Sequence, residues 1–158
     1  MSTIKWLLLD VDGVLTDGQL WYDKDGEALK CFHAHDGHGL KELIKHGIRI
    51  GIISGRDSKA LRTRLKELGI TEAYFGIQDK LTIYNQIKAK ENIEDAEIAY
   101  MGDDIPDLTI MQKVGLAITV PNAAQEIKAI AHRCTIRSGG QGAVREACDF
   151  LLQQYRNN

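Results

Sequence analysis

The sequence predicts a doubly wound α/β fold, in which helices cover both faces of a mostly parallel sheet. Short apolar runs recur along the chain, and stretches with helical periodicity lie between them. The chain has 158 residues, which is the usual length of one domain. We therefore expect residues 1–158 to form a single domain around one buried sheet.

Six segments have the pattern of strands. The first, Lys5 to Leu9, is a mostly apolar run that ends at Asp10, as expected for a strand buried on both faces of a parallel sheet. The other predicted strands are Arg49 to Ile53, Ala73 to Phe75, Ile98 to Met101, Leu116 to Val120 and, more weakly, Arg133 to Ile136.

Helical patterns occupy the intervals between these strands. Leu61, Leu65 and Leu68 recur at helical spacing, and Gly69 follows at the position of a C-terminal cap. The predicted helices are Gly39 to His46, Ser58 to Leu68, Lys80 to Glu91, Asp107 to Val114, Ala124 to Ala131 and Ala143 to Tyr155. This alternation of strand and helix is typical of parallel sheets.

One segment departs from the alternation. Residues Gln19 to Tyr22 and Glu27 to Phe32 flank Asp23–Gly26, whose composition is typical of a tight turn. We expect a β-hairpin that projects between the first strand and the first helix. The apolar side chains of its first half would be costly to leave in water, so we expect a homotetramer that packs its hairpins together.

Composition excludes several classes of function. With 20 basic and 22 acidic residues, the net charge of -2 offers no positive field for nucleic acid or an anionic membrane. The longest aliphatic run, Leu7 to Leu9, is too short to cross a bilayer. Cys31, Cys134 and Cys148 fit neither a disulfide framework nor a zinc motif, so we predict reduced thiols in a cytoplasmic protein.

Charged and reactive residues follow three of the predicted strands. They are Asp10-Val11-Asp12-Gly13, Ser54-Gly55-Arg56-Asp57 and Gly102-Asp103-Asp104-Ile105-Pro106-Asp107. In open α/β sheets ligands bind beyond these carboxyl ends, and carboxylates gathered there repel one another unless a cation lies between them. Asp10, Asp103 and one backbone carbonyl suit Mg²⁺ better than Ca²⁺, because Mg²⁺ takes few carboxylates and keeps several waters. The segment does not fit a calcium-binding EF-hand loop, because Val14 would occupy the fifth position of that loop. We interpret Asp57 and Asp79 instead as capping or turn residues.

These residue types favour phosphoryl transfer. A carboxylate attacks phosphorus as a nucleophile while Mg²⁺ and a lysine, here Lys80, neutralise the phosphoryl oxygens. A second carboxylate two residues along, Asp12, protonates the leaving oxygen and later activates water. Gly13 then relaxes the backbone where the strand turns out of the sheet.

The same residues resemble the four motifs of the haloacid dehalogenase superfamily. Asp10 to Thr16 is similar to the first motif, Ile53 to Arg56 to the second, Lys80 to the third, and Gly102 to Asp104 with Asp107 to the fourth. The resemblance implies a Rossmann-like core and the following roles: Asp10 as nucleophile, Asp12 as general acid and base, Ser54 and Lys80 as phosphate ligands, and Asp10, Asp103 and the Asp12 carbonyl as Mg²⁺ ligands. It also implies that Asp104 acts through water and that Asp107 orients Lys80 or the loop.

Neither usual insertion point has room for a cap domain, so the chain looks like the capless tetrameric branch. Asp17 to Tyr22, Phe32 to Gly39 and Gly139 to Glu146 resemble phosphatases of an eight-carbon sugar acid phosphate of lipopolysaccharide synthesis. Two alternatives stay open, a phosphatase of a nonulosonate 9-phosphate and a non-catalytic tetramerising module.

For the substrate we predict contacts from Arg56 with Gly55, and from His35 and Arg145, which could act across subunits. Many relatives carry arginine where this chain has His35, and histidine offers a carboxylate fewer donors. Arg145 is either an anion ligand or a salt-bridge partner near Glu146.

Two further features have plainer interpretations. His33, His35 and His38 lie close together, and imidazole binds zinc well, but no fourth ligand is evident, so we interpret them as surface and pocket-rim residues. The segment Ser138 to Gly142 could cradle a phosphate at a helix N-terminus, yet it follows no strong strand and lacks a lysine. We predict a mobile turn that helps to close a site.

Overall fold

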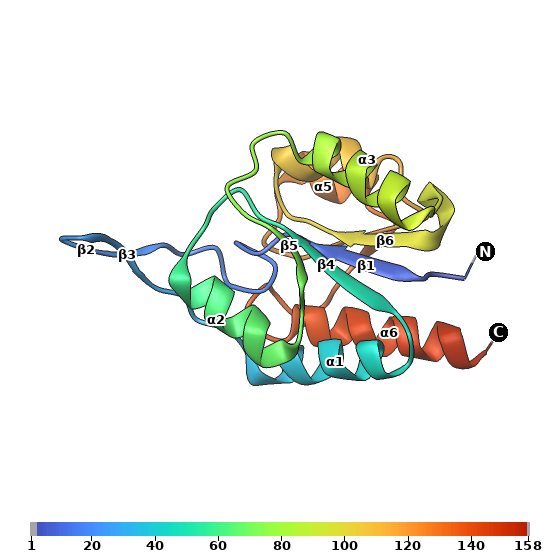
Figure 1. Cartoon of the computed structure of the whole chain (residues 1–158), viewed down its shortest axis with the longest axis horizontal. Helices are drawn as coiled ribbons and strands as arrows, with labels where there is room; N and C mark the ends of the chain where they lie inside the picture. The colour runs from blue at the N-terminus through green and yellow to red at the C-terminus, as the bar shows by residue number, and fades with distance from the viewer. Residues whose placement is uncertain (1–2, 158) are drawn as a thin grey trace.

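A six-stranded parallel sheet forms the centre of the computed structural model, which describes residues 3–157. The strands lie in the order β5-β4-β1-β6-β7-β8 (Figure 1). Their bounds are β1 (Trp6–Leu9), β4 (Arg49–Ile53), β5 (Glu72–Tyr74), β6 (Ile98–Met101), β7 (Leu116–Thr119) and β8 (Arg133–Cys134). Each predicted strand is present to within two residues, and the predicted doubly wound parallel sheet is confirmed.

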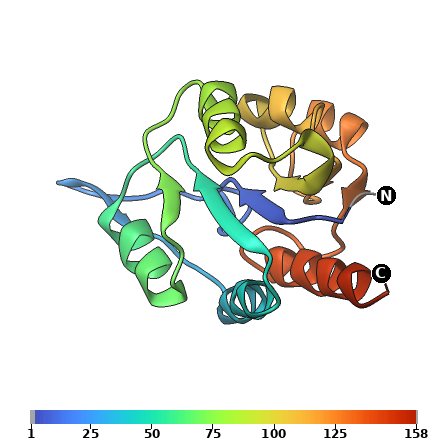
Figure 2. The ribbon, with the colours of Figure 1, turned by 45° about the vertical axis from the view of Figure 1, so that its right-hand side comes forward.

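Helices cover both faces of this sheet (Figures 1 and 2). On one face lie α1 (Ala34–Lys45), α2 (Lys59–Leu68) and α6 (Ala143–Arg156), and on the other lie α3 (Lys80–Glu91), α4 (Leu108–Met111) and α5 (Gln125–Ile130). The apolar residues of β1, β6 and β7 are buried between these two layers. Within residues 3–157, none of the helices has the length and apolarity that crossing a membrane requires.

Side-chain caps explain where two of the helices begin. Ser58 accepts the N–H of Leu61 at 3.1 Å at the start of α2, which ends at Gly69 in the left-handed region with φ 72°. Asp79 accepts the N–H of Thr82 at 3.3 Å and so caps α3, as predicted. Asp57 instead forms a paired contact with Arg62 at 2.7 and 2.8 Å.

Helix α1 begins at Ala34, five residues before the predicted start at Gly39. The Nδ1 atom of His33 accepts the N–H of His35 at 3.1 Å and caps this helix. The prediction was wrong because two glycines disfavour a helix locally. The helix nevertheless includes both glycines because α6 packs closely against it, and a Cβ on Gly39 would lie 3.0 Å from the Cβ of Cys148 on α6.

The helix predicted from Asp107 to Val114 is also shorter than expected. A 3₁₀ turn, η2 (Ile105–Asp107), precedes the four residues of α4. Asp104 and Asp107 form a capping box around this turn, in which the side chain of each accepts the backbone N–H of the other. Pro106 lies between them in the first turn, where proline is favoured. A second 3₁₀ turn, η1 (Asp95–Glu97), precedes β6.

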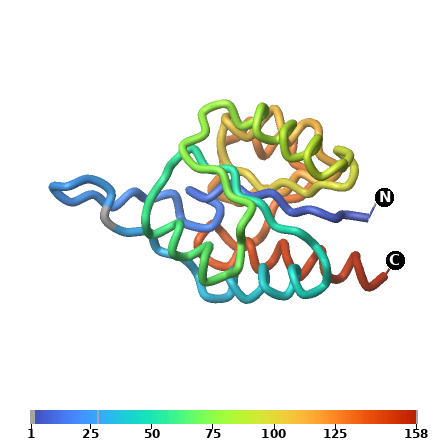
Figure 3. Tube along the Cα trace, viewed as in Figure 1, coloured from blue at the N-terminus to red at the C-terminus, as the bar shows by residue number. Residues whose placement is uncertain are grey.

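The predicted hairpin projects from the body at the end opposite the two termini (Figures 1 and 3). Its strands, β2 (Trp21–Asp23) and β3 (Gly26–Leu29), form a separate antiparallel sheet. They are shorter than the predicted halves, and the register shifts between Trp21 and Tyr22. The side chains of Trp21, Tyr22 and Leu29 are 56%, 61% and 64% exposed.

Candidate active site

The register of the central strands brings the three motif segments together. Leu9 of β1 pairs with Ile52 of β4 on one side and with Met101 of β6 on the other. The residues that follow these three strands therefore meet at one edge of the sheet, where ligands bind in this fold. A cleft of about 640 Å³ opens there, lined by Asp10, Asp12, Gly18, Leu20, Gly55, Arg56, Ile77, Gln78, Lys80, Asp103, Asp104, Pro106 and Asp107.

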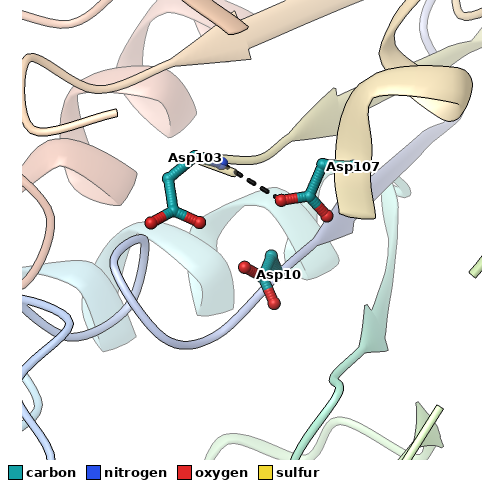
Figure 4. Close-up of side chains that lie close together, drawn as sticks. All are labelled: Asp10, Asp103 and Asp107. Atoms are coloured by element: carbon teal, nitrogen blue, oxygen red, sulfur yellow. Dashed lines mark hydrogen bonds between the residues drawn. The ribbon is translucent and has the colours of Figure 1, made fainter. Parts of the chain in front are cut away.

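Three carboxylates form the floor of this cleft (Figure 4). Asp10, Asp103 and Asp107 each offer an oxygen, and these oxygens lie within 4.8 Å of one another. Asp10 and Asp107 are buried, and Asp103 is half-buried. The Oδ2 atom of Asp107 accepts the N–H of Asp103 at 3.2 Å, which fixes the two residues relative to each other.

This acidic cluster has the properties of a divalent cation site. Burial raises the pKa of Asp10, and the nearby charge of Asp107 raises it further. Burial and the charge of Asp10 likewise raise the pKa of Asp103. The buried Oδ1 of Asp103 has no hydrogen-bond partner within residues 3–157. A hard cation with oxygen ligands, such as Mg²⁺, would satisfy this oxygen and offset the repulsion.

Lys80 connects two members of the cluster. It is the first residue of α3 and is buried, and its Nζ lies 2.8 Å from Asp10 Oδ1 and 2.9 Å from Asp107 Oδ1. Burial lowers the pKa of Lys80, but the two carboxylates outweigh burial and raise it, so the side chain is a cation. The contact between Asp107 and Lys80 that the family resemblance implied is thus present.

Tyr100 is also part of this hydrogen-bond network, through Asp107. Its fully buried hydroxyl donates to Asp107 Oδ1 at 2.6 Å. This residue was not predicted as part of the site, because it lies in the middle of an apolar strand, where tyrosine is usually a packing residue. The one available signal was a polar atom at a buried position, which requires a partner.

Asp12 points toward the hairpin side of the cleft. Lys30, just beyond β3, donates to Asp12 Oδ1 at 2.7 Å and lies 2.8 Å from Glu27 Oε1. Arg56 approaches the same group, with its Nε 3.9 Å from Asp12 Oδ2. Sequence analysis did not select Lys30 or Glu27, because nothing in a hairpin's own pattern shows that its base returns to a strand end far away in sequence.

The other predicted site residues lie in different places. Ser54 is buried at the end of β4, and its Oγ accepts the N–H of Arg56 at 3.2 Å. The Asp104 side chain is exposed and accepts the N–H of Ile105 at 2.8 Å, so it does not join the three clustered carboxylates. His35 and Arg145 line a separate depression of about 530 Å³ beside the start of α6. Within one chain they do not reach the cleft, and Arg145 pairs with Asp149 at 2.9 Å.

The glycine-rich segment packs behind the first motif. Gly13 adopts φ 84°, and a Cβ there would lie 1.9 Å from Asp103 Oδ2. A Cβ on Gly139 would lie 1.9 Å from the Gly13 carbonyl oxygen, so only glycine fits at either position. Asn122 joins the two loops, donating to Gly13 O at 3.0 Å and accepting from Gly139 N at 2.9 Å. The segment Ser138 to Gly142, predicted as a mobile turn, thus packs against the loop that follows Asp10 and is fixed to it through Asn122.

The histidine cluster does not form a metal site in this structure. Within residues 3–157, the acidic cluster is the only group of three or more potential ligands close enough to hold one ion. His33 already uses Nδ1 to cap α1, and its ring meets that of His35 edge to face at 4.9 Å between centroids.

Comparisons with known proteins agree with this fold and site. A family model described as haloacid dehalogenase-like hydrolase matches residues 76–147. The chain is 42% identical to the 3-deoxy-D-manno-octulosonate 8-phosphate phosphatase of Yersinia pestis, over 96% of this chain and 81% of the relative. The chain therefore belongs to the 3-deoxy-D-manno-octulosonate 8-phosphate phosphatase family of haloacid dehalogenase-like hydrolases.

Solved structures show the same likeness. The 3-deoxy-D-manno-octulosonate 8-phosphate phosphatase of Moraxella catarrhalis, solved in complex with a magnesium ion, a phosphate ion and a KDO molecule, superposes with a TM-score of 0.93 at 42% identity, covering 96% of this chain and 87% of that one. The cobalt-bound Haemophilus influenzae phosphatase gives 0.92 at 40% identity, covering 96% and 88%. The predicted fold and family resemblance are confirmed.

Proposed function

We propose that this chain is a Mg²⁺-dependent phosphatase that hydrolyses 3-deoxy-D-manno-octulosonate 8-phosphate to the free sugar acid and phosphate. The observation that carries the proposal is the buried Asp10, Lys80 and Asp107 network at the floor of an open cleft, with Asp12 two residues beyond Asp10. The relatives' activity supports the choice of substrate. The reaction would supply sugar acid for lipopolysaccharide synthesis in the cytoplasm.

The chain's own residues divide the reaction into two steps. In the first, an Asp10 oxygen bonds to phosphorus, the bond from phosphorus to the sugar oxygen breaks, and Asp12 gives that oxygen a proton. In the second, Asp12 takes a proton from water, the water oxygen bonds to phosphorus, and the bond from phosphorus to the Asp10 oxygen breaks. Lys80 holds Asp10 in place, and with Ser54 it would bind the phosphoryl oxygens.

The acidic cluster fits the metal that this chemistry requires. Asp10 and Asp103 would hold Mg²⁺ together with the Asp12 carbonyl, and the Asp107 carboxylate lies in the same cluster. When bound, Mg²⁺ supplies positive charge to the phosphoryl group. Asp104 would act through water, as an exposed residue at the rim.

Substrate recognition would depend on the rim of the cleft. Arg56 is partly exposed there beside Gly55, and it can offer a planar pair of donors to the carboxylate of a sugar acid. His35 and Arg145 would contribute only across a subunit boundary, because their own depression is separate from the cleft. A nonulosonate 9-phosphate carries the same two charged groups and is the second candidate substrate.

The proposal includes a homotetramer. Within residues 3–157 no cap domain covers the cleft, whereas phosphoryl chemistry benefits from a pocket that excludes water. Trp21, Tyr22 and Leu29 leave a large apolar surface on the hairpin, and packing hairpins from several copies would bury it. Such packing would also supply the wall that a cap domain provides elsewhere.

Turnover of the purified chain tests the proposal. We expect phosphate release from the octulosonate 8-phosphate to exceed that from the nonulosonate 9-phosphate, to stop in EDTA and to return with Mg²⁺. Faster turnover of the nine-carbon substrate would overturn the substrate assignment and leave the chemistry in place. Undiminished turnover in metal-free buffer would overturn the metal role, and an absence of turnover on either substrate and on an aryl phosphate would favour the non-catalytic module.

A further inference from the structure

Lys30 is a buried cation between the hairpin and the catalytic loop. Its side chain is 2% exposed, and it follows β3 at the point where the hairpin rejoins the body. Its Nζ lies 2.7 Å from Asp12 Oδ1 and 2.8 Å from Glu27 Oε1. A lysine this deeply buried is costly unless it is paired, so these contacts keep the ammonium group in place.

Arg56 closes the contacts around Lys30 into a ring of four alternating charges. Its Nε lies 3.9 Å from Asp12 Oδ2, and its Nη1 lies 3.7 Å from Glu27 Oε2. Its Nη1 also donates to the Tyr22 hydroxyl at 3.1 Å. The ring therefore takes Asp12 and Arg56 from the body and Glu27 and Lys30 from the hairpin segment.

The two oxygens of Asp12 differ as a result. Oδ1 accepts a full hydrogen bond from Lys30, whereas the 3.9 Å from Oδ2 to Arg56 is beyond hydrogen-bond reach. Oδ2 is thus the oxygen left to exchange a proton with a group in the cleft that Asp12 lines. Without Lys30, the carboxylate could rotate and neither oxygen would be held.

We propose that Lys30 is a positioning residue, which holds Asp12 so that the same oxygen gives a proton to the leaving group and later takes one from water. This inference rests on the proposed function and assigns the hairpin a part in the chemistry. A proton moves from Asp12 Oδ2 to the sugar oxygen as its bond to phosphorus breaks. A proton returns from water to Oδ2 as the water oxygen bonds to phosphorus and the bond from phosphorus to the Asp10 oxygen breaks.

The two steps respond differently to the leaving group. A sugar alkoxide needs a proton to leave, whereas 4-nitrophenolate leaves without one. Loss of Asp12 positioning should therefore slow both steps with the sugar acid phosphate, but only the second step with 4-nitrophenyl phosphate. A purely structural defect would lower all of these rates together, or would lower the fraction of active protein.

The test is pre-steady-state kinetics of Lys30→Met in the full chain with Mg²⁺. We expect kcat on the octulosonate phosphate to fall about tenfold to a hundredfold with little change in KM. With 4-nitrophenyl phosphate, the burst rate of nitrophenolate should stay near wild type while the steady-state rate falls. Lys24→Met, the same change at an exposed lysine of the same hairpin, should leave both rates unchanged.

A second variant separates Asp12 from Glu27. Lys30→Met leaves Glu27 without its nearer cation, with only Arg56 at 3.7 Å, so the fold is checked by circular dichroism and the double variant Lys30→Met with Glu27→Gln is measured too. Full recovery in the double variant would overturn the proposal, as would equal losses in burst and steady-state rates. The rates with 4-nitrophenyl phosphate do not depend on which sugar acid phosphate is the natural substrate. If the substrate assignment were wrong, these rates would still test the role of Lys30.

Discussion

The floor of the cleft and its hairpin wall are built in different ways. The buried part of the floor consists of Asp10, Lys80, Tyr100 and Asp107, which are at most 8% exposed. Asp10 follows β1, Tyr100 lies in β6, and Lys80 and Asp107 lie in α3 and η2. The wall is the rim where Asp12 and Arg56 of the body meet Glu27 and Lys30 of the hairpin segment, whose two-stranded ribbon has no strand partner in the main sheet. The ion pairs of Lys30 with Asp12 and of Glu27 with Arg56 connect that ribbon to the body.

This difference suggests separate roles, with the floor needed for the reaction on any substrate and the wall for substrate selection and rate. Strand register fixes the floor, because a shift would move the whole apolar core with it. The wall depends on charges at 2.7 to 3.9 Å and on a ribbon whose apolar side chains remain exposed in one chain. Changes to the floor should therefore abolish all turnover, and changes to the wall should alter which substrates react and how fast.

The largest expected effect is that of Asp10→Asn at the floor. An amide cannot attack phosphorus, so turnover should fall on the order of 10⁴-fold or more on every phosphate ester. The variant should remain folded, because it removes one of three crowded carboxylates. Phosphate release and circular dichroism would be measured together. A folded variant with a rate near wild type would disprove the nucleophilic role.

Arg56→Ala tests the wall, and its effect should depend on the substrate. Losing a charge-assisted contact to a carboxylate costs about 1.5 to 3 kcal/mol, which corresponds to roughly a ten- to hundredfold fall in kcat/KM for the octulosonate phosphate. A small aryl phosphate lacks the distant carboxylate, so its kcat/KM should change little. Equal losses on the two substrates would show that Arg56 serves the phosphate or the fold.

Trp21→Glu tests whether other copies of the chain cover the wall. A charge on this 56% exposed residue would be buried in a tetramer, so the variant should have a lower mass by light scattering at micromolar concentration. Its kcat/KM for the sugar acid phosphate should fall by less than that of Arg56→Ala. Lys59→Glu, an exposed change on α2, is the matched control. A wild-type monomer with full activity would contradict the role of assembly.

The same division explains what the sequence could predict. Most of the floor was predictable because apolar runs mark strands and parallel strands bring their carboxyl ends together, so Asp10 and Asp103 were expected at one edge. Lys80 was expected from the chemistry and the resemblance, whereas Tyr100 was missed. The contact of Asp107 with Lys80 followed from the resemblance and is present in the structure.

The missed features depend on contacts between distant segments. Lys30 and Asp12 are 18 residues apart, and their contact depends on how the hairpin leaves the body. Helix α1 starts early because Gly37 and Gly39 allow close approach of Arg64 and of α6, which outweighs their poor helix propensity. Local pattern cannot show either effect, since each is decided by packing.

Away from both regions, Asp36 gives the smallest effect and a distinct pH dependence. It is 1% exposed on α1, and its Oδ1 accepts the N–H of Arg145 at 2.9 Å, near the start of α6. Its Oδ2 is buried without a hydrogen-bond partner within residues 3–157. Burial raises the pKa of Asp36, and the hydrogen bond from Arg145 only partly opposes this rise.

Because the pKa of Asp36 is raised in the folded state, the sign of its contribution to the pH dependence of the free energy of unfolding is fixed. The folded chain holds the Asp36 proton more tightly than the unfolded chain, so this group lowers the free energy of unfolding as pH rises above the ordinary Asp range near 4. Asp36→Asn keeps an oxygen acceptor for Arg145 and removes the charge. The variant's free energy of unfolding, measured in urea, should therefore improve relative to wild type between pH 4 and pH 7. Asp57→Asn should show the opposite sign in a lower window, because the hydrogen bond from Arg62 lowers the pKa of Asp57: wild type loses this stabilisation as pH falls below about 4, and the variant does not. A relative stability of Asp36→Asn that falls with rising pH would show that the carboxylate is better charged than neutral at this site.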